Sequence, residues 1–476
     1  MARKLITLVE ISADRFNGHN MPLKNPNYIS NRQELTSHGN SSLRKAAIDV
    51  IEHGLRAADP YVGVKRLLVR HGDVLQVGNL VLELNKFERV FILGAGKASL
   101  GIAQALEEIL KDNISDGLFV LRYGSKVDLN RTKVIYANHP YPDENSLHAG
   151  QLMMEFAKTF TEKDLVFTGI TGGSSALLSL PADGISIEDK ATVNKLLLLS
   201  GADIVAINII RKHLSKIKGG WLAAEILPAT LVNLTVSDVV GDMLDYITCP
   251  TVPDTSTFDD ARRVMDIYDL WDKFPTSARD CIRKGGPKQE TPKSFGDLPL
   301  HSFVVVPGDA ACVGAYARSR ELGFNAMLLT SMLKGEAKDA GAMFASIGKE
   351  IVLHGRPMPS PCAVVAGGEN VTTIGTESLG HGGPNQEFAL SASLEIDGFG
   401  NIAIASIDTD GIDGVTEAAG GLVDGSTWIT AKNKGMDPYL ALKKHDSQIV
   451  LDQVGGSVIS GFTGTNVNDL KLLLVE

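Results

Sequence analysis

The sequence RVFILGAGKASLGIAQALEEILKD, residues 89–112, decides the fold class. Its apolar beginning predicts a buried strand, and the glycines that follow predict a sharp turn. Apolar residues then recur at helical spacing, at Ile102, Leu106, Ile109 and Leu110. A buried strand, a glycine turn and an amphipathic helix form the repeating unit of α/β proteins. We therefore expect a mostly parallel sheet covered by helices on both faces.

The same order of elements recurs along the chain. It appears in DLVFTGITGGSSALLSL (164–180), TLVNLTVSDVVGD (230–242) and HSFVVVPGDAACVGAYARSREL (301–322). Four later apolar runs are also predicted strands: 325–331, 361–369, 401–411 and 469–476. A helix is expected from Ser41 or Ser42, which would cap it, to Pro60, which would end it.

The length predicts two domains. The chain has 476 residues, whereas single hydrophobic cores stop growing at roughly 250–300 residues. A polar, Pro- and Gly-rich segment at 282–299 precedes a new strand and is typical of a domain junction. We expect a loosely ordered extension at 1–42, an N-terminal α/β domain at 43–290 and a C-terminal α/β domain at 291–476.

Charge and composition exclude several classes of protein. Lys and Arg number 46 against 56 Asp and Glu, a net charge of −10, so no broadly basic surface exists to bind nucleic acid. The four cysteines form no C-x-x-C pair. No run approaches the ~18 apolar residues of a membrane helix. We expect a cytoplasmic protein without nucleic-acid or membrane partners.

The turn GAGKAS, Gly94 to Ser99, is the first candidate site. Backbone N–H groups and the positive end of the helix dipole suit an anion there, and Lys97 adds a full charge. Neither a Walker A loop nor the G-x-G-x-x-G spacing of dinucleotide-binding proteins is present. The alternative is a tight turn with a solvated lysine.

A second glycine turn, TGGSS, adds hydroxyl groups to another candidate anion site. It comprises Gly172, Gly173, Ser174 and Ser175. The alternative is an ordinary capped helix. Further on, RKHLSKIKGG (211–220) carries Lys212, Lys216 and Lys218. These lysines would suit phosphate oxygens if they converged, and otherwise form a solvated helix end.

Acidic loops follow several predicted strands. They hold Asp238 and Asp242, then Asp309, and finally Asp408, Asp410 and Asp413. One or two such carboxylates suffice for Mg²⁺, which keeps several waters and binds substrate phosphates. Turn chemistry is the alternative, because Asp and Gly favour turns. It is weaker for the last loop, where three carboxylates crowd together.

Three further loops combine glycines with amides or carboxylates. They are AGGEN (366–370), GHGGPNQEFAL (380–390) and GFTGTNVNDL (461–470). Such groups can recognise polar ligands. His139, His381 and His445 stand isolated, without the spacing of a metal site. The absence of G-x-S-x-G disfavours a serine hydrolase.

In order along the chain, these motifs resemble the glycerate 2-kinase family, whose C-terminal half is the MOFRL domain. The matching stretches include GAGKA, NHPYPDENS, ITGGSSALL, KHLSKIKGG, VSDVVGD, GGPNQE, DTDGIDG and TGTNVNDL. They cover nearly everything from Leu43 to the C-terminus. An ordered set of this kind is far more specific than any one motif.

The resemblance implies ATP-dependent phosphorylation of D-glycerate to 2-phospho-D-glycerate, with ATP and Mg²⁺. It implies a Rossmann-like N-terminal domain and a smaller MOFRL-type domain with a cleft between them. Self-association is compatible with it. The residues that we expect to act are Lys97 and Asp410 in catalysis, Asp238 and Asp408 at the metal, and Gly94, Gly96, Gly172, Gly173, Ser174, Ser175, Lys216, Asn385 and Glu387 in binding substrate and phosphate.

One departure concerns the family pattern G-G-R-N-Q-E, where Pro384 replaces the arginine. Proline supplies neither charge nor an N–H group. Another cation could replace the arginine, with His381 and Lys334 as candidates, or the acid substrate differs. The first alternative is therefore a kinase of another small hydroxy acid. A second is a hydroxypyruvate reductase using NADH or NADPH, a label that has been attached to this family, and a third is a non-catalytic sugar-acid binding protein.

Overall fold

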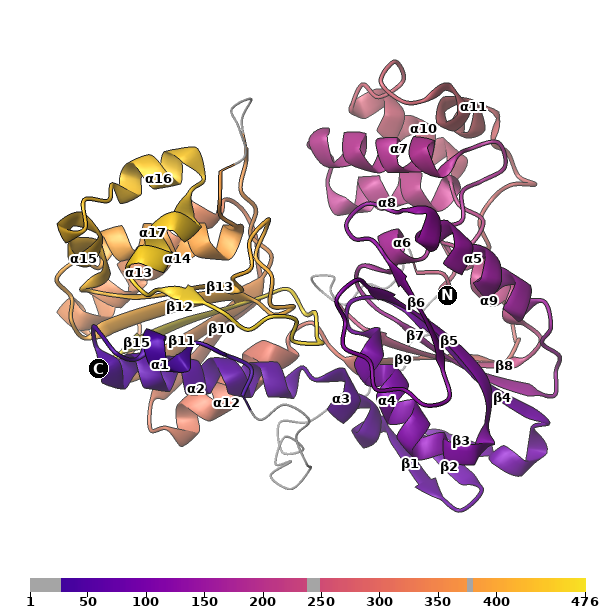
Figure 1. Cartoon of the computed structure of the whole chain (residues 1–476), viewed down its shortest axis with the longest axis horizontal. Coiled ribbons are helices and arrows are strands. Elements are labelled where there is room, and N and C mark those ends of the chain that lie inside the picture. The colour runs from indigo at the N-terminus through magenta and orange to yellow at the C-terminus, as the bar shows by residue number, and fades with distance from the viewer. Residues whose placement is uncertain (1–26, 238–248, 375–379) are drawn as a thin grey trace. The chain divides into compact units, whose positions relative to one another are not determined.

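The structure is a computed structural model that describes residues 27–237, 249–374 and 380–476 (Figure 1). The chain forms two compact units. The first unit is Pro60–Val306, and the second combines residues 27–59 with Pro307–Glu476. The α/β prediction is confirmed in both.

A six-stranded parallel sheet organises the first unit. Its order is β6-β5-β4-β7-β8-β9. The strands are β4 (Arg89–Ala95), β5 (Ile114–Arg122), β6 (Lys133–Ala137), β7 (Asp164–Ile170), β8 (Thr230–Val236) and β9 (Leu300–Val306). Helix α4 (Ser99–Leu110) follows β4 and buries the predicted apolar face. This parallel sheet is the one that the opening segment predicts.

Other elements of the first unit surround this sheet. They are α3 (Pro60–Leu67), α5 (Glu144–Ala157), α6 (Ser174–Leu177), α7 (Ile187–Leu199), α8 (Ile204–His213), α9 (Trp221–Ile226), α10 (Phe258–Ile267), α11 (Thr276–Lys284) and an antiparallel sheet of β1 (Leu68–His71), β2 (Val74–Val77) and β3 (Leu80–Glu83). Helices α7, α8, α10 and α11 share a separate apolar core and form a helical group beyond the sheet (Figure 1).

The second unit contains a mixed sheet of order β10-β11-β15-β12-β13-β14. The strands are β10 (Asn325–Leu333), β11 (Cys362–Gly368), β12 (Ile402–Asp408), β13 (Gly420–Asp424), β14 (Ser457–Val458) and β15 (Asp469–Val475). Among the described strands of this second sheet, only the β10–β11 pair is parallel. The predicted strands exist, but the expectation of a mostly parallel sheet is wrong for this unit, because β15 inserts antiparallel between β11 and β12.

Helices cover both faces of the second sheet. On one face lie α13 (Ala337–His354) and α14 (Pro384–Glu395), with α15 (Thr427–Asn433), α16 (Pro438–Lys444) and α17 (Ser447–Gln453) beyond them (Figure 1). The other face carries α2 (Ser41–Ala57) and α12 (Ala310–Glu321), which pack against each other. The short helix α1 (Arg32–Leu35) precedes α2.

The unit boundaries differ from the expected domain limits. Helix α2 belongs to the second unit, and β9 pairs with β8 in the first. The polar segment 282–299 is no linker, since Thr291 donates to Asp254 at 2.8 Å and Asp254 N–H donates to the carbonyl of Pro292. Helix α2 is capped by Asn40, and Pro60 begins α3 instead of ending a longer helix.

Residues 27–42 are ordered, contrary to our expectation of a loose extension. The side chains of Tyr28, Ile29 and Leu35 are buried. Ser30 N–H donates to the carbonyl of Ile459 at 2.8 Å. Just beyond, the buried Arg44 donates to Asp424 of β13 at 2.5 Å. These contacts make the described N-terminal residues part of the second unit.

Candidate active site

The two glycine turns of the first unit lie against each other, because β4 and β7 are neighbours in the sheet. Lys97 N–H donates to the carbonyl of Gly172 at 2.8 Å. Thr171 N–H donates to the carbonyl of Ala95 at 3.0 Å, and its hydroxyl accepts the N–H of Ala98 at 3.1 Å. The GAGKAS and TGGSS motifs therefore form one structure.

Glycine is required where these turns meet. Gly96 has a φ of +135°, and a Cβ there would lie 2.1 Å from the hydroxyl of Thr171. Gly173 has a φ of +83°, and its Cβ would lie 2.9 Å from Cγ of Lys97 and 3.3 Å from the ring of His139. Lys97, Gly173 and His139 thus converge on one point. The sequence alone shows no partner for His139, because its neighbours here come from distant segments.

Other predicted residues of these turns have packing contacts. Gly94 lies inside β4, where a Cβ would fall 2.2 Å from the ring of Phe119. Its backbone is paired with β5 and β7. Ser174 is buried and its N–H donates to the carbonyl of Thr171 at 3.2 Å. Half-buried Ser175 follows it in α6, which has only four residues.

The lysines of RKHLSKIKGG do not converge. Lys212 is buried and donates to Asp254 at 2.5 Å. Lys216 is exposed and donates to Asp183 at 2.7 Å. Lys218 is buried and donates to the carbonyl of Leu178, at the end of α6, at 2.8 Å. The predicted binding residue Lys216 thus forms a surface ion pair, while Lys218 contacts the residue that follows α6.

Burial gives Lys218 an unusual titration. Burial, with a smaller contribution from Arg211, lowers the pKa of Lys218 from 10.5 to about 7. The unfolded chain therefore binds more protons between pH 7 and 10.5, so this residue's contribution to the free energy of unfolding rises with pH. Between pH 7 and 10, we expect the free energy of unfolding of the wild type to rise by roughly 3 kcal/mol relative to that of Lys218→Met, as measured by urea unfolding. A difference that stays constant with pH would refute this assignment.

The acidic loop after β12 folds on itself. Asp408 accepts the N–H of Asp410 at 2.9 Å, and Asp410 accepts the N–H of Ile412 at 2.9 Å. Asp408 is half-buried and Asp410 is buried. These oxygens are the donor type that Mg²⁺ prefers. No cluster of three or more metal-ligating side chains occurs within 27–237, 249–374 or 380–476. Asp238 and Asp242 lie outside the described residues.

Asp413 caps helix α14 from the same loop. Its carboxylate accepts the N–H groups of Asn385 at 3.0 Å and Gln386 at 2.8 Å. Burial raises the pKa of Asp413 to about 7. The side chain of Asn385 also donates to Asp469 at 2.8 Å, and Asp469 accepts from buried Lys471. Asn385, a predicted binding residue, is therefore engaged inside the unit.

Glu387, the other predicted binding residue of this motif, forms a pair with a histidine. Its carboxylate lies 2.7 Å from Nδ1 of His445. Burial raises the pKa of Glu387, while His445 opposes the shift. Glu387 and His445 are 58 positions apart, so the sequence does not reveal this contact. The one sequence feature that pointed to such a contact is that Glu387 follows a glycine-rich loop. A glutamate that becomes buried there needs a hydrogen-bonding partner.

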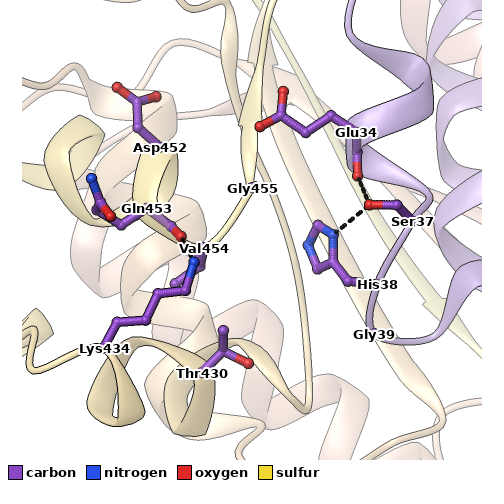
Figure 2. A pocket seen from close by; sticks show the side chains of 10 residues that line it. All are labelled: Glu34, Ser37, His38, Gly39, Thr430, Lys434, Asp452, Gln453, Val454 and Gly455. Carbon is purple, nitrogen blue, oxygen red and sulfur yellow. Dashed lines mark hydrogen bonds between the residues drawn. The ribbon is translucent and has the colours of Figure 1, made fainter.

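A separate pocket of about 530 Å³ lies elsewhere in the second unit (Figure 2). It opens between the segment around His38 and helices α15 and α17, and Lys434 and Asp452 lie on its far wall. None of the predicted site residues lines it. The two candidate regions, the paired turns and the acidic loop with the start of α14, are therefore distinct from this pocket.

Family models match both parts of the chain. Residues 46–283 match a domain of unknown function, DUF4147, and residues 362–469 match the MOFRL family. The glycerate 2-kinase of Pyrococcus horikoshii is 42% identical over 91% of this chain and 97% of its own length. The D-glycerate 2-kinase of Thermotoga maritima is 39% identical over 91% and 99%. A putative hydroxypyruvate reductase of Agrobacterium vitis is 39% identical over 81% and 99%.

Solved structures agree with these relatives. A glycerate kinase from Thermotoga maritima superposes with a TM-score of 0.77 and 37% identity, covering 91% of this chain and all of that one. A protein from Pyrococcus horikoshii gives a TM-score of 0.74 at 42% identity, covering 91% and 98%. In the described parts of the chain, no helix combines the length and apolar character needed to cross a bilayer. The resemblance read from the motifs is confirmed, and the chain belongs to the glycerate 2-kinase family.

Proposed function

We propose that this protein transfers the terminal phosphoryl group of ATP to the 2-hydroxyl of D-glycerate, giving 2-phospho-D-glycerate. The observation that carries the proposal is the junction of the two glycine turns. There Lys97 lies beside Gly173 and His139 at the start of α4, in a chain whose relatives are named glycerate kinases.

Lys97 has the central part in this proposal. Phosphoryl transfer depends mainly on positioning and on neutralising charge that builds on the phosphoryl oxygens. The Lys97 ammonium would stabilise that charge or hold the substrate carboxylate. Gly96 lets the two turns meet closely, and the N–H groups of Gly172 and Gly173 and the hydroxyl of Ser175 would donate to phosphate oxygens.

Asp408 and Asp410 belong to the same reaction in this proposal. Asp408 would hold Mg²⁺; Asp238, the other predicted metal ligand, lies outside the described residues. The ion, when bound, supplies positive charge to the nucleotide phosphates. Asp410 would orient the 2-hydroxyl and accept its proton as the new bond to phosphorus forms. We further propose a cytoplasmic location, without nucleic-acid partners.

Two other activities deserve separate tests. Pro384 favours a kinase with another small hydroxy acid as acceptor. The reductase name carried by some relatives favours oxidation of NADH or NADPH by hydroxypyruvate. The second activity needs a nicotinamide site, and the spacing of Gly94, Gly96 and Gly101 does not fit one.

Purified protein can decide among these activities. ADP release is measured with ATP, Mg²⁺ and each of several acids, including D-glycerate, L-glycerate, glycolate and lactate. In parallel, NADH and NADPH oxidation is followed with hydroxypyruvate. We expect ADP release with D-glycerate and no reductase activity. Hydroxypyruvate-dependent NADH or NADPH oxidation without D-glycerate-dependent ADP release would contradict the proposal.

A further inference from the structure

The start of α14 offers few groups to an anion. Pro384 opens the helix and has neither charge nor an N–H group. The next two N–H groups, of Asn385 and Gln386, already donate to the carboxylate of Asp413. An acid that bound here would therefore need a cationic side chain from another element.

His445 is placed to be that side chain. Glu387 lies one helical turn after Pro384, and therefore on the same face of α14. Its carboxylate contacts Nδ1 of His445 at 2.7 Å. The side chain of Glu387 is 2% exposed and that of His445 is 21% exposed. Because Nδ1 faces the buried carboxylate, Nε2 is the ring atom left to reach a ligand.

The backbone fixes His445 beside the segment that leads into α14. A Cβ at Gly380 would lie 2.0 Å from the carbonyl of Lys444, and one at Gly382 would lie 2.8 Å from that of His445. His445 has a φ of +60°, an unusual value for a residue other than glycine. His381 N–H donates to Asp446 at 2.9 Å and its carbonyl accepts the N–H of Gln448.

Unmatched polar atoms accompany His445. The hydroxyl oxygen of Ser447 and the amide oxygen Oε1 of Gln386 are buried without a hydrogen-bond partner in the part of the chain that is described. Ser447 lies against Gly382, where a Cβ would come within 2.3 Å of its oxygen. Buried polar atoms are almost always satisfied, so these two indicate a polar ligand or water beside the start of α14.

The candidates from sequence fit less well. Lys334 and His381 are both exposed. The contacts of His381 with Asp446 and Gln448 run through its backbone. Within residues 27–237, 249–374 and 380–476, no buried carboxylate contacts either side chain, whereas Glu387 contacts His445.

We propose that His445, oriented by Glu387, binds the carboxylate of the hydroxy acid substrate and supplies the positive charge that Pro384 lacks. The inference rests on the proposed function and names a residue that sets its acid specificity. The protonated ring would donate from Nε2 to a carboxylate oxygen, while Nδ1 donates to Glu387.

The test compares kinetic constants of the full-length protein in the ADP assay. In His445→Gln we expect the KM for D-glycerate to rise at least tenfold, with kcat within threefold and the KM for ATP within twofold of wild type. A partial loss of fold would instead lower the apparent kcat and leave both KM values unchanged, because only the folded fraction turns over. His354→Gln, an exposed histidine of α13, is the control and should leave them unchanged. A KM for D-glycerate within twofold of wild type in His445→Gln would overturn the inference, as would the rise appearing only in His381→Gln.

Charge rescue sharpens the test. Adding Pro384→Arg to His445→Gln places a cation on the same face of α14, and the KM for D-glycerate should recover at least threefold. If the double variant has a KM for D-glycerate as high as that of His445→Gln alone, the claim that His445 supplies the charge missing at Pro384 is refuted.

Binding can be followed without turnover. In the wild type, D-glycerate should shift the histidine ring NMR signal that His445→Gln removes. An active enzyme whose signal does not move would refute the contact. If the wild type phosphorylates another acid and not D-glycerate, the proposed function fails, and the same titration with that acid still decides the role of His445.

Discussion

Replacing Lys97 by Met should reduce kcat/KM for D-glycerate by about 100- to 1000-fold, the usual cost of losing one group that stabilises transition-state charge. Met keeps the stem of the side chain, and Cγ is the atom that faces Gly173. Lys97 is half-buried and its backbone contact with Gly172 does not involve the ammonium. The fold should therefore persist, with the free energy of unfolding changed by less than about 1 kcal/mol.

A matched variant isolates the charge at this position. Lys158→Met removes an exposed lysine of the same unit, at the end of α5, and should keep kcat/KM within twofold. ADP release and urea unfolding are measured for both variants. Near-normal turnover in Lys97→Met would remove this residue from the mechanism. Equal losses in both variants would point to a general effect of lost charge.

Replacing Asp254 by Ala should lower the free energy of unfolding of the first unit by about 3–5 kcal/mol, because it leaves the buried ammonium of Lys212 without its carboxylate. The two side chains are 0% and 4% exposed and lie 2.5 Å apart. Asp254 also accepts from Ser256 and Thr291. Burial would raise the pKa of Asp254, but Lys212 and the hydrogen bonds from Ser256 outweigh it and lower that pKa, so the ion pair exists at neutral pH.

An exposed pair provides the comparison. Asp183→Ala breaks the surface contact with Lys216 and should cost less than about 1 kcal/mol. The double variant Asp254→Leu with Lys212→Met removes both buried charges and should be more stable than Asp254→Ala. Urea unfolding followed by tryptophan fluorescence and circular dichroism measures all three. Similar midpoints for Asp254→Ala and Asp183→Ala would show that the buried pair does not stabilise the unit.

The sequence predicts most helices and strands because their signals are local. The apolar spacing of α4 and the run of β4 lie within 24 residues, and both elements form as expected. The direction of β15 was not predictable. Long-range packing determines which strands pair with β15. It places this last strand of the chain between β11 and β12. The expected domain limits differ from the observed units for a similar reason. Helix α2 packs against α12, which lies far along the chain, and so belongs to the second unit.

The candidate site was predicted in part. Both glycine turns were found, but only the sheet order makes β4 and β7 neighbours and brings Lys97 to Gly173. Composition could not tell which lysine of 211–220 is exposed, and the structure buries Lys212 and Lys218 instead of Lys216. The pairing of Glu387 with His445 depends on a contact between distant segments. Local motifs therefore indicate which residues can take part in the chemistry. The order of the strands determines which of these residues lie close together.

The most direct test of the central claim is the identity of the phosphorylated product. D-glycerate, ATP and Mg²⁺ are incubated with the wild type, and phosphorus–proton coupling is measured by NMR. We predict a product whose phosphorus couples to the single proton on C2, formed in step with ADP. Coupling to the two protons on C3, or ADP release without a phosphorylated acid, would contradict the account.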